Sequence, residues 1–272
     1  MKRSIKLVTI LKYLFLAVVS FFCVFPFLWM MIGTSNSSVD IRTGRMAPGP
    51  LLLENMRRLF TEYDMARVLL NSLKVTGISV LLILLVAGMA GYGFQFYTTR
   101  TKERTYGFVL ATMMIPFAAL MVPLFQIIVG MKLINSHWAL ILVSTASVFM
   151  IFFFRQSFAN YPREILQAAR IDGAGEFHIY FRIFLPSIKS TYFAAAIYSF
   201  LTSWNSYLWP LIVLQTNETR TTTLLISSMS SSYTPEYGVI MCAIVLSTLP
   251  VVIVFFAFQR QFVQGMLGSV KQ

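Results

Sequence analysis

The sequence predicts an all-α membrane protein with six transmembrane helices. Of its 272 residues, 57% are hydrophobic and only 12% are charged, which is more apolar surface than a water-soluble domain can bury. Apolar runs long enough to cross a bilayer also recur along the chain, and backbone groups in lipid must pair within their own segment, as they do in helices. The net charge of +12 could suggest nucleic-acid binding. The charges are sparse and lie between apolar runs, so they indicate membrane topology instead.

The first apolar run, Leu11–Ile32, is expected to be a retained transmembrane helix. It follows basic residues, as a signal peptide does, but it is long for a signal sequence and no A-x-A cleavage site follows it. Five further runs are long enough to cross: Leu69–Phe96, Tyr106–Gly130, His137–Phe158, Ile188–Leu214 and Gly238–Phe258.

The distribution of lysine and arginine predicts the orientation of these spans. With six spans, fourteen of these residues fall on the side of the two termini and seven on the opposite side. Because cytoplasmic loops are enriched in Lys and Arg, both termini are expected in the cytoplasm. The loop between the fourth and fifth spans is then cytoplasmic too.

This fourth loop, Tyr161–Ser187, is predicted to form two short helices. Pro162 suits the first turn of a helix, and Gly173 suits its end because glycine adopts the left-handed conformation cheaply. One face of the first helix is expected to hold Ile165, Ala168 and Ala169. The second is expected to present an aromatic face of Phe177, Tyr180, Phe181 and Phe184. Residue chemistry alone leaves two interpretations open: a helix pair lying on lipid headgroups, or a narrow tip that enters a protein cleft.

The same loop resembles the EAA loop of permease subunits of ABC importers. That pattern joins an E-A-A triplet to D-G-A and to a later L-P, and this chain has Gln167-Ala168-Ala169, Asp172-Gly173-Ala174 and Leu185-Pro186. The resemblance implies a coupling helix that sits in a cleft of an ATPase subunit. The implied coupling residues are Glu164, Gln167, Ala168, Ala169, Asp172, Gly173, Ala174, Leu185 and Pro186. Gln167 replaces the usual glutamate, which leaves a neutral hydrogen bond at best, and Ser190 stands where many relatives have proline.

A wider resemblance, over residues 55–271, is to the carbohydrate-importer branch, and within it to the smaller permease of maltose-type transporters. It includes "NSLKVTG", "AGYGF", "SWNSYLWPLIVL" and the C-terminal "FVQGMLGSVK". The resemblance implies a permease domain at 67–272, preceded by a span and an extracellular loop at 1–66. It also implies a bacterial plasma membrane, a second permease, two cytoplasmic ATPase subunits and an extracellular solute-binding protein that delivers a mono-, di- or oligosaccharide. Glycerol-3-phosphate or another small polar solute is the alternative cargo.

A polar and aromatic cluster in the fifth span is the candidate substrate pathway. Its members are Trp204, Asn205, Tyr207 and Trp209. Aromatic faces can stack on sugar rings and amides can bond sugar hydroxyls, but Trp and Tyr also form belts at membrane interfaces. In the second span, Lys74 is expected to reach the outer headgroups, and Asn71 and Ser72 are expected to cap the helix.

The sequence also argues against several kinds of chemistry. It contains no phosphate-binding G-x-x-x-x-G-K-[ST], no nucleophile elbow and no H-E-x-x-H, and its two histidines do not form a metal pattern. No Asp or Glu lies within a predicted span, which disfavours an intramembrane enzyme and a proton- or sodium-coupled secondary transporter. We expect no cofactor or metal on this chain, with ATP and Mg²⁺ bound by partner ATPase subunits.

Overall fold

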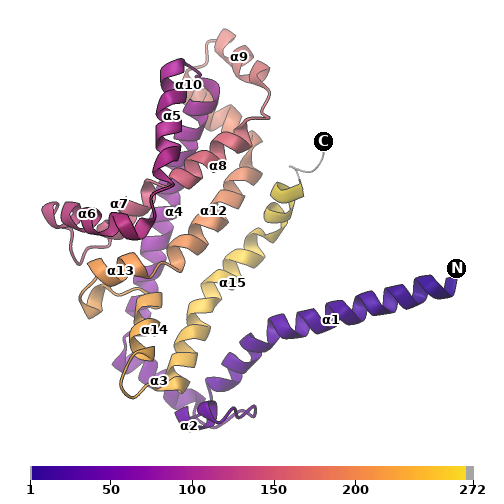
Figure 1. Cartoon of the computed structure of the whole chain (residues 1–272), viewed down its shortest axis with the longest axis vertical. Coiled ribbons are helices and arrows are strands. Elements are labelled where there is room, and N and C mark those ends of the chain that lie inside the picture. Colours follow the sequence, from indigo (N-terminus) through magenta and orange to yellow (C-terminus); the bar gives the residue numbers. More distant parts are fainter. Residues whose placement is uncertain (1, 268–272) are drawn as a thin grey trace. The chain divides into compact units, whose positions relative to one another are not determined.

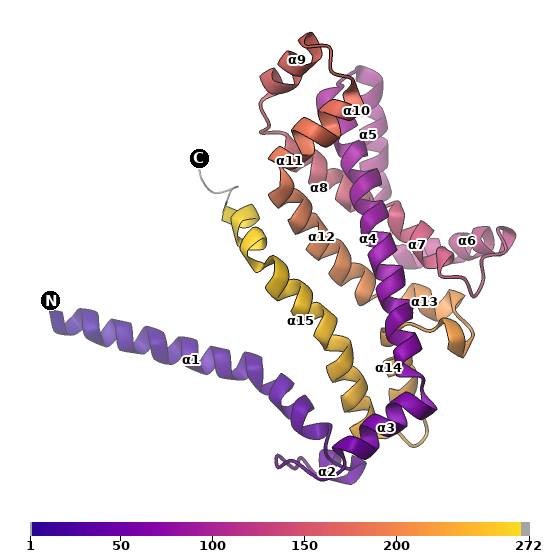
Figure 2. The ribbon, with the colours of Figure 1, turned by 180° about the vertical axis from the view of Figure 1, so that it is seen from behind.

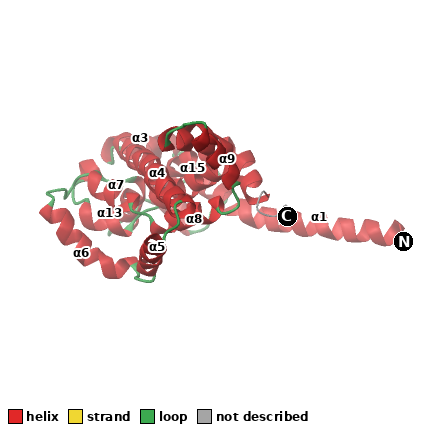
Figure 3. Ribbon diagram, turned by 90° about the horizontal axis from the view of Figure 1, so that it is seen from above, coloured by secondary structure: helices red, strands yellow, loops and turns green. Residues whose placement is uncertain are grey.

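The computed structural model describes residues 2–267, and these residues form helices and connecting loops without any strand (Figure 3). The last part of the C-terminal resemblance, from residue 268 on, lies outside the described residues. The chain forms two compact units, residues 1–66 with 225–249 and residues 67–224 with 250–272. The division predicted from the sequence, at residues 66 and 67, stays a prediction.

Figures 1 and 2 show the order of the helices in each unit. The first unit contains α1 (Lys2–Gly33), α2 (Ser38–Arg42), α3 (Leu52–Glu62), most of α14 (Thr222–Ser230) and the first part of α15 (Tyr237–Leu267). The second begins with α4 (Met65–Phe96), α5 (Arg100–Thr112), α6 (Phe117–Gly130), α7 (Trp138–Thr145) and α8 (Val148–Phe158). It continues with α9 (Arg163–Ile171), α10 (Glu176–His178), a π-helix (Ile179–Phe184), α11 (Leu185–Ser187), α12 (Lys189–Trp204), α13 (Leu208–Val213) and a 3₁₀ turn (Asn217–Thr219).

Among the described residues, four helical segments are long and apolar enough to cross a membrane. They are Thr9–Gly33, Met65–Phe96, Trp138–Phe158 and Tyr237–Gln259. These segments agree with four of the predicted spans, and the helical fold class is confirmed. The third combines α7 and α8, which meet at a break where Ser147 caps α8 by accepting a hydrogen bond from the Met150 N–H.

The predicted span Tyr106–Gly130 is wrong as a single helix. It consists of α5 and α6, whose axes differ by 102° across a break. Pro116 stands immediately before α6. Proline has no N–H to donate and disfavours helical geometry at the residue before it, so the helix of α5 cannot continue through Ile115 and Pro116. The bent pair counts as a fifth span only if it is taken as one crossing.

The predicted span Ile188–Leu214 is likewise divided, into α12 and α13 with residues 205–207 between them. Pro210 explains the position of this break. In a continuous helix its missing N–H would leave the carbonyl of Ser206 without a partner, and its ring would clash with that carbonyl. The sixteen residues of α12 reach about 24 Å at 1.5 Å per residue, which is short of a typical bilayer core of about 30 Å. The count of six spans therefore stays a prediction.

The first unit is held together by a polar cluster beneath α3. Buried Asn55 donates from Nδ2 to the carbonyl oxygens of Thr34 (2.9 Å) and Asn36 (3.2 Å). Arg58 on α3 pairs with Glu236, just before α15, at 2.6 Å. Helix α3 thus connects the loop after α1 to the start of α15.

The second unit has two apolar cores. The first joins α4, α8, α12 and the α9–π-helix loop, with Phe154, Phe158, Leu166 and Phe184 at its centre. The second surrounds Ile128, Leu140 and Trp209 and joins α4, α6, α7 and α13. Helices α4, α8 and α12 run alongside one another in both ribbon views (Figures 1 and 2). These helices position the loop around α9, at the first core, and a cavity beside the second core.

Candidate functional site

The loop predicted to be cytoplasmic forms a short helix that ends at a left-handed glycine. Helix α9 begins after Pro162, and Gly173 has φ = +81°. The N–H groups of Gly173 and Ala174 donate to the carbonyl oxygens of Arg170 and Ala169, both at 3.0 Å. This pair of bonds is the usual way in which a helix ends at a left-handed glycine. The predicted stop at Asp172-Gly173 is confirmed.

The three residues predicted to share one face of α9 differ in burial. Leu166 and Ala169 are buried, whereas Ile165 is 44% exposed and Ala168 is exposed. Leu166 belongs to the aromatic core, and Ala169 lies one turn further along the same face. The predicted face of Ile165, Ala168 and Ala169 is therefore divided, with Ala169 turned toward the core beside Leu166 and the other two turned outward.

Most of the coupling residues implied by the resemblance lie on the surface of the loop. Exposed members are Glu164, Gln167, Ala168, Asp172, Gly173 and Pro186; Ala174 and Leu185 are half-buried. Two apolar side chains beside them are also open to the surroundings, Ile171 at 86% and Phe177 at 74% exposure. The tip is therefore narrow, apolar in part and free of covering side chains from the described residues.

The predicted aromatic face of the second helix divides into two sets. Tyr180 and Phe184 are buried, whereas Phe177 and Phe181 are exposed. The physical reason is that residues 179–184 form a π-helix with i→i+5 bonds, so the α-helical spacing used for the prediction does not apply there. Tyr180 and Phe184 both pack against Tyr92 of α4, with ring centroids 5.2 and 4.9 Å away.

An ion pair with two tyrosines fastens the loop to α4; we call Arg170, Glu176, Tyr92 and Tyr97 the loop clasp. Arg170 Nε lies 2.7 Å from Glu176 Oε1, and the Tyr92 hydroxyl donates to Glu176 Oε2 at 3.4 Å. The Arg170 guanidinium also lies 5.2 Å from the centroid of the Tyr97 ring. Hydrogen bonding from Arg170 lowers the pKa of Glu176 below its usual value. The sequence reasoning missed this set, although opposite charges on both sides of Asp172-Gly173 were a signal for it.

The residues proposed for the substrate pathway are not all brought together. Trp204 and Trp209 are buried; Asn205 is exposed at the end of α12, and Tyr207 is half-buried. The Trp204 ring stacks on Phe200 at 5.5 Å, and Trp209 Nε1 donates to the Ala139 carbonyl at 3.0 Å. The two tryptophans line a common cavity, whereas Asn205 and Tyr207 are not among its lining residues.

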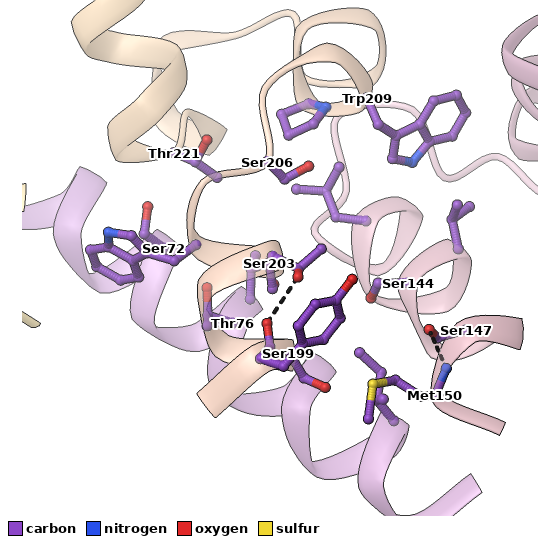
Figure 4. Close-up of a pocket in the computed structure, with 18 of the residues that line it drawn as sticks. Ser72, Thr76, Ser144, Ser147, Met150, Ser199, Ser203, Ser206, Trp209 and Thr221 are labelled. Carbon is purple, nitrogen blue, oxygen red and sulfur yellow. Dashed lines mark hydrogen bonds between the residues drawn. The ribbon is translucent and has the colours of Figure 1, made fainter. Parts of the chain in front are cut away.

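This cavity has a volume of about 280 Å³ and lies between α4, α6, α7, α8, α12 and α13. Figure 4 shows its hydroxyl groups around one space. The lining hydroxyl residues are Ser72, Thr76, Ser144, Ser147, Ser199, Thr202, Ser203, Ser206 and Thr221. Phe117, Tyr198, Trp204 and Trp209 add aromatic walls, and no charged side chain lines the space. The cavity is thus suited to a neutral guest with many hydroxyls.

The polar side chains of α4 were a signal that the sequence reasoning misread. Asn71 and Ser72 lie well inside α4, which begins at Met65, so their interpretation as helix caps is wrong. Asn71 Nδ2 donates to the Glu218 carbonyl at 2.8 Å, and Ser72 Oγ lies 3.1 Å from Thr222 Oγ1. Polar residues repeated within an apolar helix indicated an inward polar face rather than a cap.

Apolar helices long enough to cross a membrane and a polar cavity without charged side chains indicate a membrane-embedded protein that can hold a polar guest. Comparison with known proteins agrees. Residues 83–268, more than half of the chain, match the family described as binding-protein-dependent transport system inner membrane component. The chain belongs to this family and is a permease subunit of such a transport system.

The names of individual relatives state what they transport. The chain is 47% identical to the lactose transport system permease protein LacG of Rhizobium radiobacter over 98% of its length and 97% of the relative's. It is 30% identical, over 83% of each chain, to the sn-glycerol-3-phosphate transport system permease protein UgpE of Yersinia pestis. A bacterial ABC transporter that imports the acidic polysaccharide alginate has the same fold, with a TM-score of 0.83, 20% identity and coverage of 96% of this chain and 98% of that one.

Proposed function

We propose that this permease imports a neutral sugar as part of an ATP-driven ABC importer. The observation that supports a neutral sugar is the cavity of the second unit, lined by hydroxyl and aromatic side chains and by no charged one. Hydroxyl groups both donate and accept hydrogen bonds, so they match the hydroxyls of a sugar. The similarity to a lactose permease supports the same class of cargo.

The charge-free cavity disfavours the alternative cargo, glycerol-3-phosphate. A phosphate group taken into this space would lose water and find no cation to replace it, which is costly. Lys74 and His137 line a separate hollow with Asn135 and Ser136. A cargo carried by those residues would therefore follow a different route from the proposed one.

The partners follow from the same proposal. One of two ATPase subunits, which bind ATP and Mg²⁺, docks against the exposed tip around Gln167, Ile171 and Phe177, and both termini lie on this cytoplasmic side. A second permease completes the pathway, and an extracellular binding protein delivers the sugar. The lining of the cavity holds no carboxylate, which disfavours an ATP-independent transporter driven by protons or sodium.

Transport by the complete complex tests this function. The chain, its second permease, its ATPase and its binding protein are reconstituted in lipid vesicles, and uptake of labelled lactose and of glycerol-3-phosphate is measured with and without ATP. Lactose uptake that requires ATP is the expected result. Uptake of glycerol-3-phosphate alone would overturn the cargo, and uptake without ATP would overturn the energy source.

A further inference from the structure

We propose that this chain itself contains a binding subsite for one sugar ring, with the hydroxyls of Ser199 and Thr221 as its specificity-determining contacts. The proposal rests on the proposed function and deepens it. It assigns sugar binding to the cavity of this subunit, so that the second permease is not the sole holder of the sugar within the membrane.

The first argument is that these two hydroxyls have no hydrogen-bond partner. Ser199 is 2% exposed and Thr221 is 6% exposed, and neither Ser199 Oγ nor Thr221 Oγ1 is bonded. Buried polar atoms are almost always paired, because leaving one unpaired loses the hydrogen bonds that water would have made. Both residues line the cavity, from α12 and from the segment before α14 (Figure 4).

The second argument is the contrast with other hydroxyls around the same space. Ser144 Oγ donates to Ser79 Oγ at 3.0 Å, and Thr202 Oγ1 donates to the Tyr198 carbonyl at 2.9 Å. Ser72 is paired with Thr222. Part of the wall is therefore satisfied by the protein, whereas Ser199 and Thr221 are lining residues whose hydroxyl oxygens are buried without a partner, so that a bond from a guest would relieve them. Serine and threonine hydroxyls rotate and can donate or accept, as sugar hydroxyls can.

The third argument concerns the shape of the site. The loop between α12 and α13 brings Ser206 to the cavity wall, and non-helical backbone at membrane depth is tolerated where it is buried or lines a cavity. Trp204 is held by its stacking on Phe200 and supplies a fixed aromatic wall. A volume of about 280 Å³ lies just below the usual range of ligand sites, roughly 300–1,000 Å³, which suits one sugar ring with any further rings outside it.

The test uses Ser199→Ala and Thr221→Val in the complete complex, with lactose as the probe. Each change removes a hydroxyl with little change of shape. Both are expected to raise the KM for ATP-dependent lactose uptake by about fivefold or more, which corresponds to one lost hydrogen bond, while ATP hydrolysis without sugar stays the same. Thr248→Val is the matched control, because the Thr248 hydroxyl bonds the carbonyl of Ile244 in its own helix, so its KM should not change.

Two further readouts separate binding from a structural role. Since the two hydroxyls are unpaired without sugar, both variants should be at least as thermally stable as the wild type when no lactose is present, and should gain less stability from added lactose. A series of monodeoxy lactoses should contain one sugar that the wild type takes up poorly but that Ser199→Ala no longer distinguishes from lactose. The same experiment with Thr221→Val should point to another hydroxyl of the sugar.

The outcomes are distinguishable. If the wild-type complex takes up no sugar, the proposed function fails and the subsite fails with it. If the wild type takes up lactose but both variants have the wild-type KM, the subsite alone is overturned. Losses of stability without lactose, or the same discrimination among deoxy sugars in variant and wild type, would also overturn it, since both indicate a structural role for the hydroxyls.

Discussion

Gly173 ends α9 in a conformation that other residues adopt only at a cost, so changing it should re-aim the loop without unfolding the protein. Its φ is +81°, and a Cβ added there would meet no atom within 4 Å. The cost of a substitution is therefore conformational and not steric. A left-handed conformation costs an L-residue roughly 1–2 kcal/mol. Part of this is offset because alanine restricts the unfolded chain more than glycine does, by about 0.4–1 kcal/mol.

The net cost for Gly173→Ala is about 1 kcal/mol, and Gly173→Val should cost more because β-branched residues are strongly disfavoured at positive φ. Since about 1.4 kcal/mol is a factor of ten, the equilibrium constant for the loop conformation with both terminal hydrogen bonds should fall about fivefold in the alanine variant. Gly173→Asn should be milder than Gly173→Ala, although asparagine is larger, because asparagine tolerates the left-handed region. The expected order of function is glycine, asparagine, alanine, valine.

The assay is co-purification of the ATPase with each variant, together with sugar-stimulated ATP hydrolysis in vesicles. Gly175→Ala is the matched control: it adds the same methyl group two residues away, also into open space, but at φ = −71°. If Gly175→Ala and Gly173→Ala reduce docking equally, bulk at the tip and not backbone conformation is responsible. If Gly173→Asn is worse than Gly173→Ala, the conformational argument is refuted.

Three further predictions concern α4 and the loop clasp. Arg170→Glu should change the free energy of unfolding by no more than about 1 kcal/mol, because the Arg170–Glu176 pair is partly exposed, yet it should reduce coupled ATP hydrolysis. Adding Glu176→Arg should restore part of this hydrolysis. Failure of this rescue would count against the loop clasp. Because the pKa of Glu176 is lowered, the loop clasp is fully formed above the usual glutamate pKa and is lost only as the pH falls through the lower folded-state pKa. The Arg170–Glu176 contacts, followed by NMR, should therefore be unchanged between pH 8 and 6. Weakening of these contacts in that interval would contradict the assignment. Gly91→Ala should destabilise the protein by about 1–3 kcal/mol, because the added Cβ would lie 2.6 Å from Phe154 Cβ. In the same helix, the Cβ added by Gly93→Ala would meet no atom within 4 Å, so this variant should be neutral or more stable by up to about 1 kcal/mol. Equal melting temperatures for the two variants would refute this.

Hydropathy and local turn chemistry predicted the helical membrane class and the end of α9, because both depend on nearby residues. The transmembrane segments at Met65–Phe96 and Tyr237–Gln259 follow directly from apolar composition. The glycine after Asp172 has the expected positive φ for a local reason too, since few other residues adopt it. Predictions of this kind need no knowledge of tertiary packing.

The breaks and the cavity could not be predicted in the same way. A window of apolar residues does not distinguish a straight span from the bent pair α5 and α6, although Pro116 was a visible signal for the bend. The cavity brings together Ser72, Ser199 and Thr221 from distant parts of the chain. No local pattern shows that Ser72 has a partner and the other two have none, because this depends on how α4, α12 and the segment before α14 pack.

The π-helical turn at Ile179–Phe184 sets the rotational phase between the helices on either side of it, α10 and α11. One residue more or less in a helical run rotates everything beyond it by about 100°, and a π turn holds such an additional residue. The direction of Phe177 on α10 is therefore fixed relative to that of Leu185 on α11 by this turn. Loop exchanges between related permeases should respect it: a junction before Ile179 changes the loop sequence alone, whereas a junction within the turn changes sequence and phase together. A chimaera of the second kind would fail to couple even if every residue that touches the ATPase were matched.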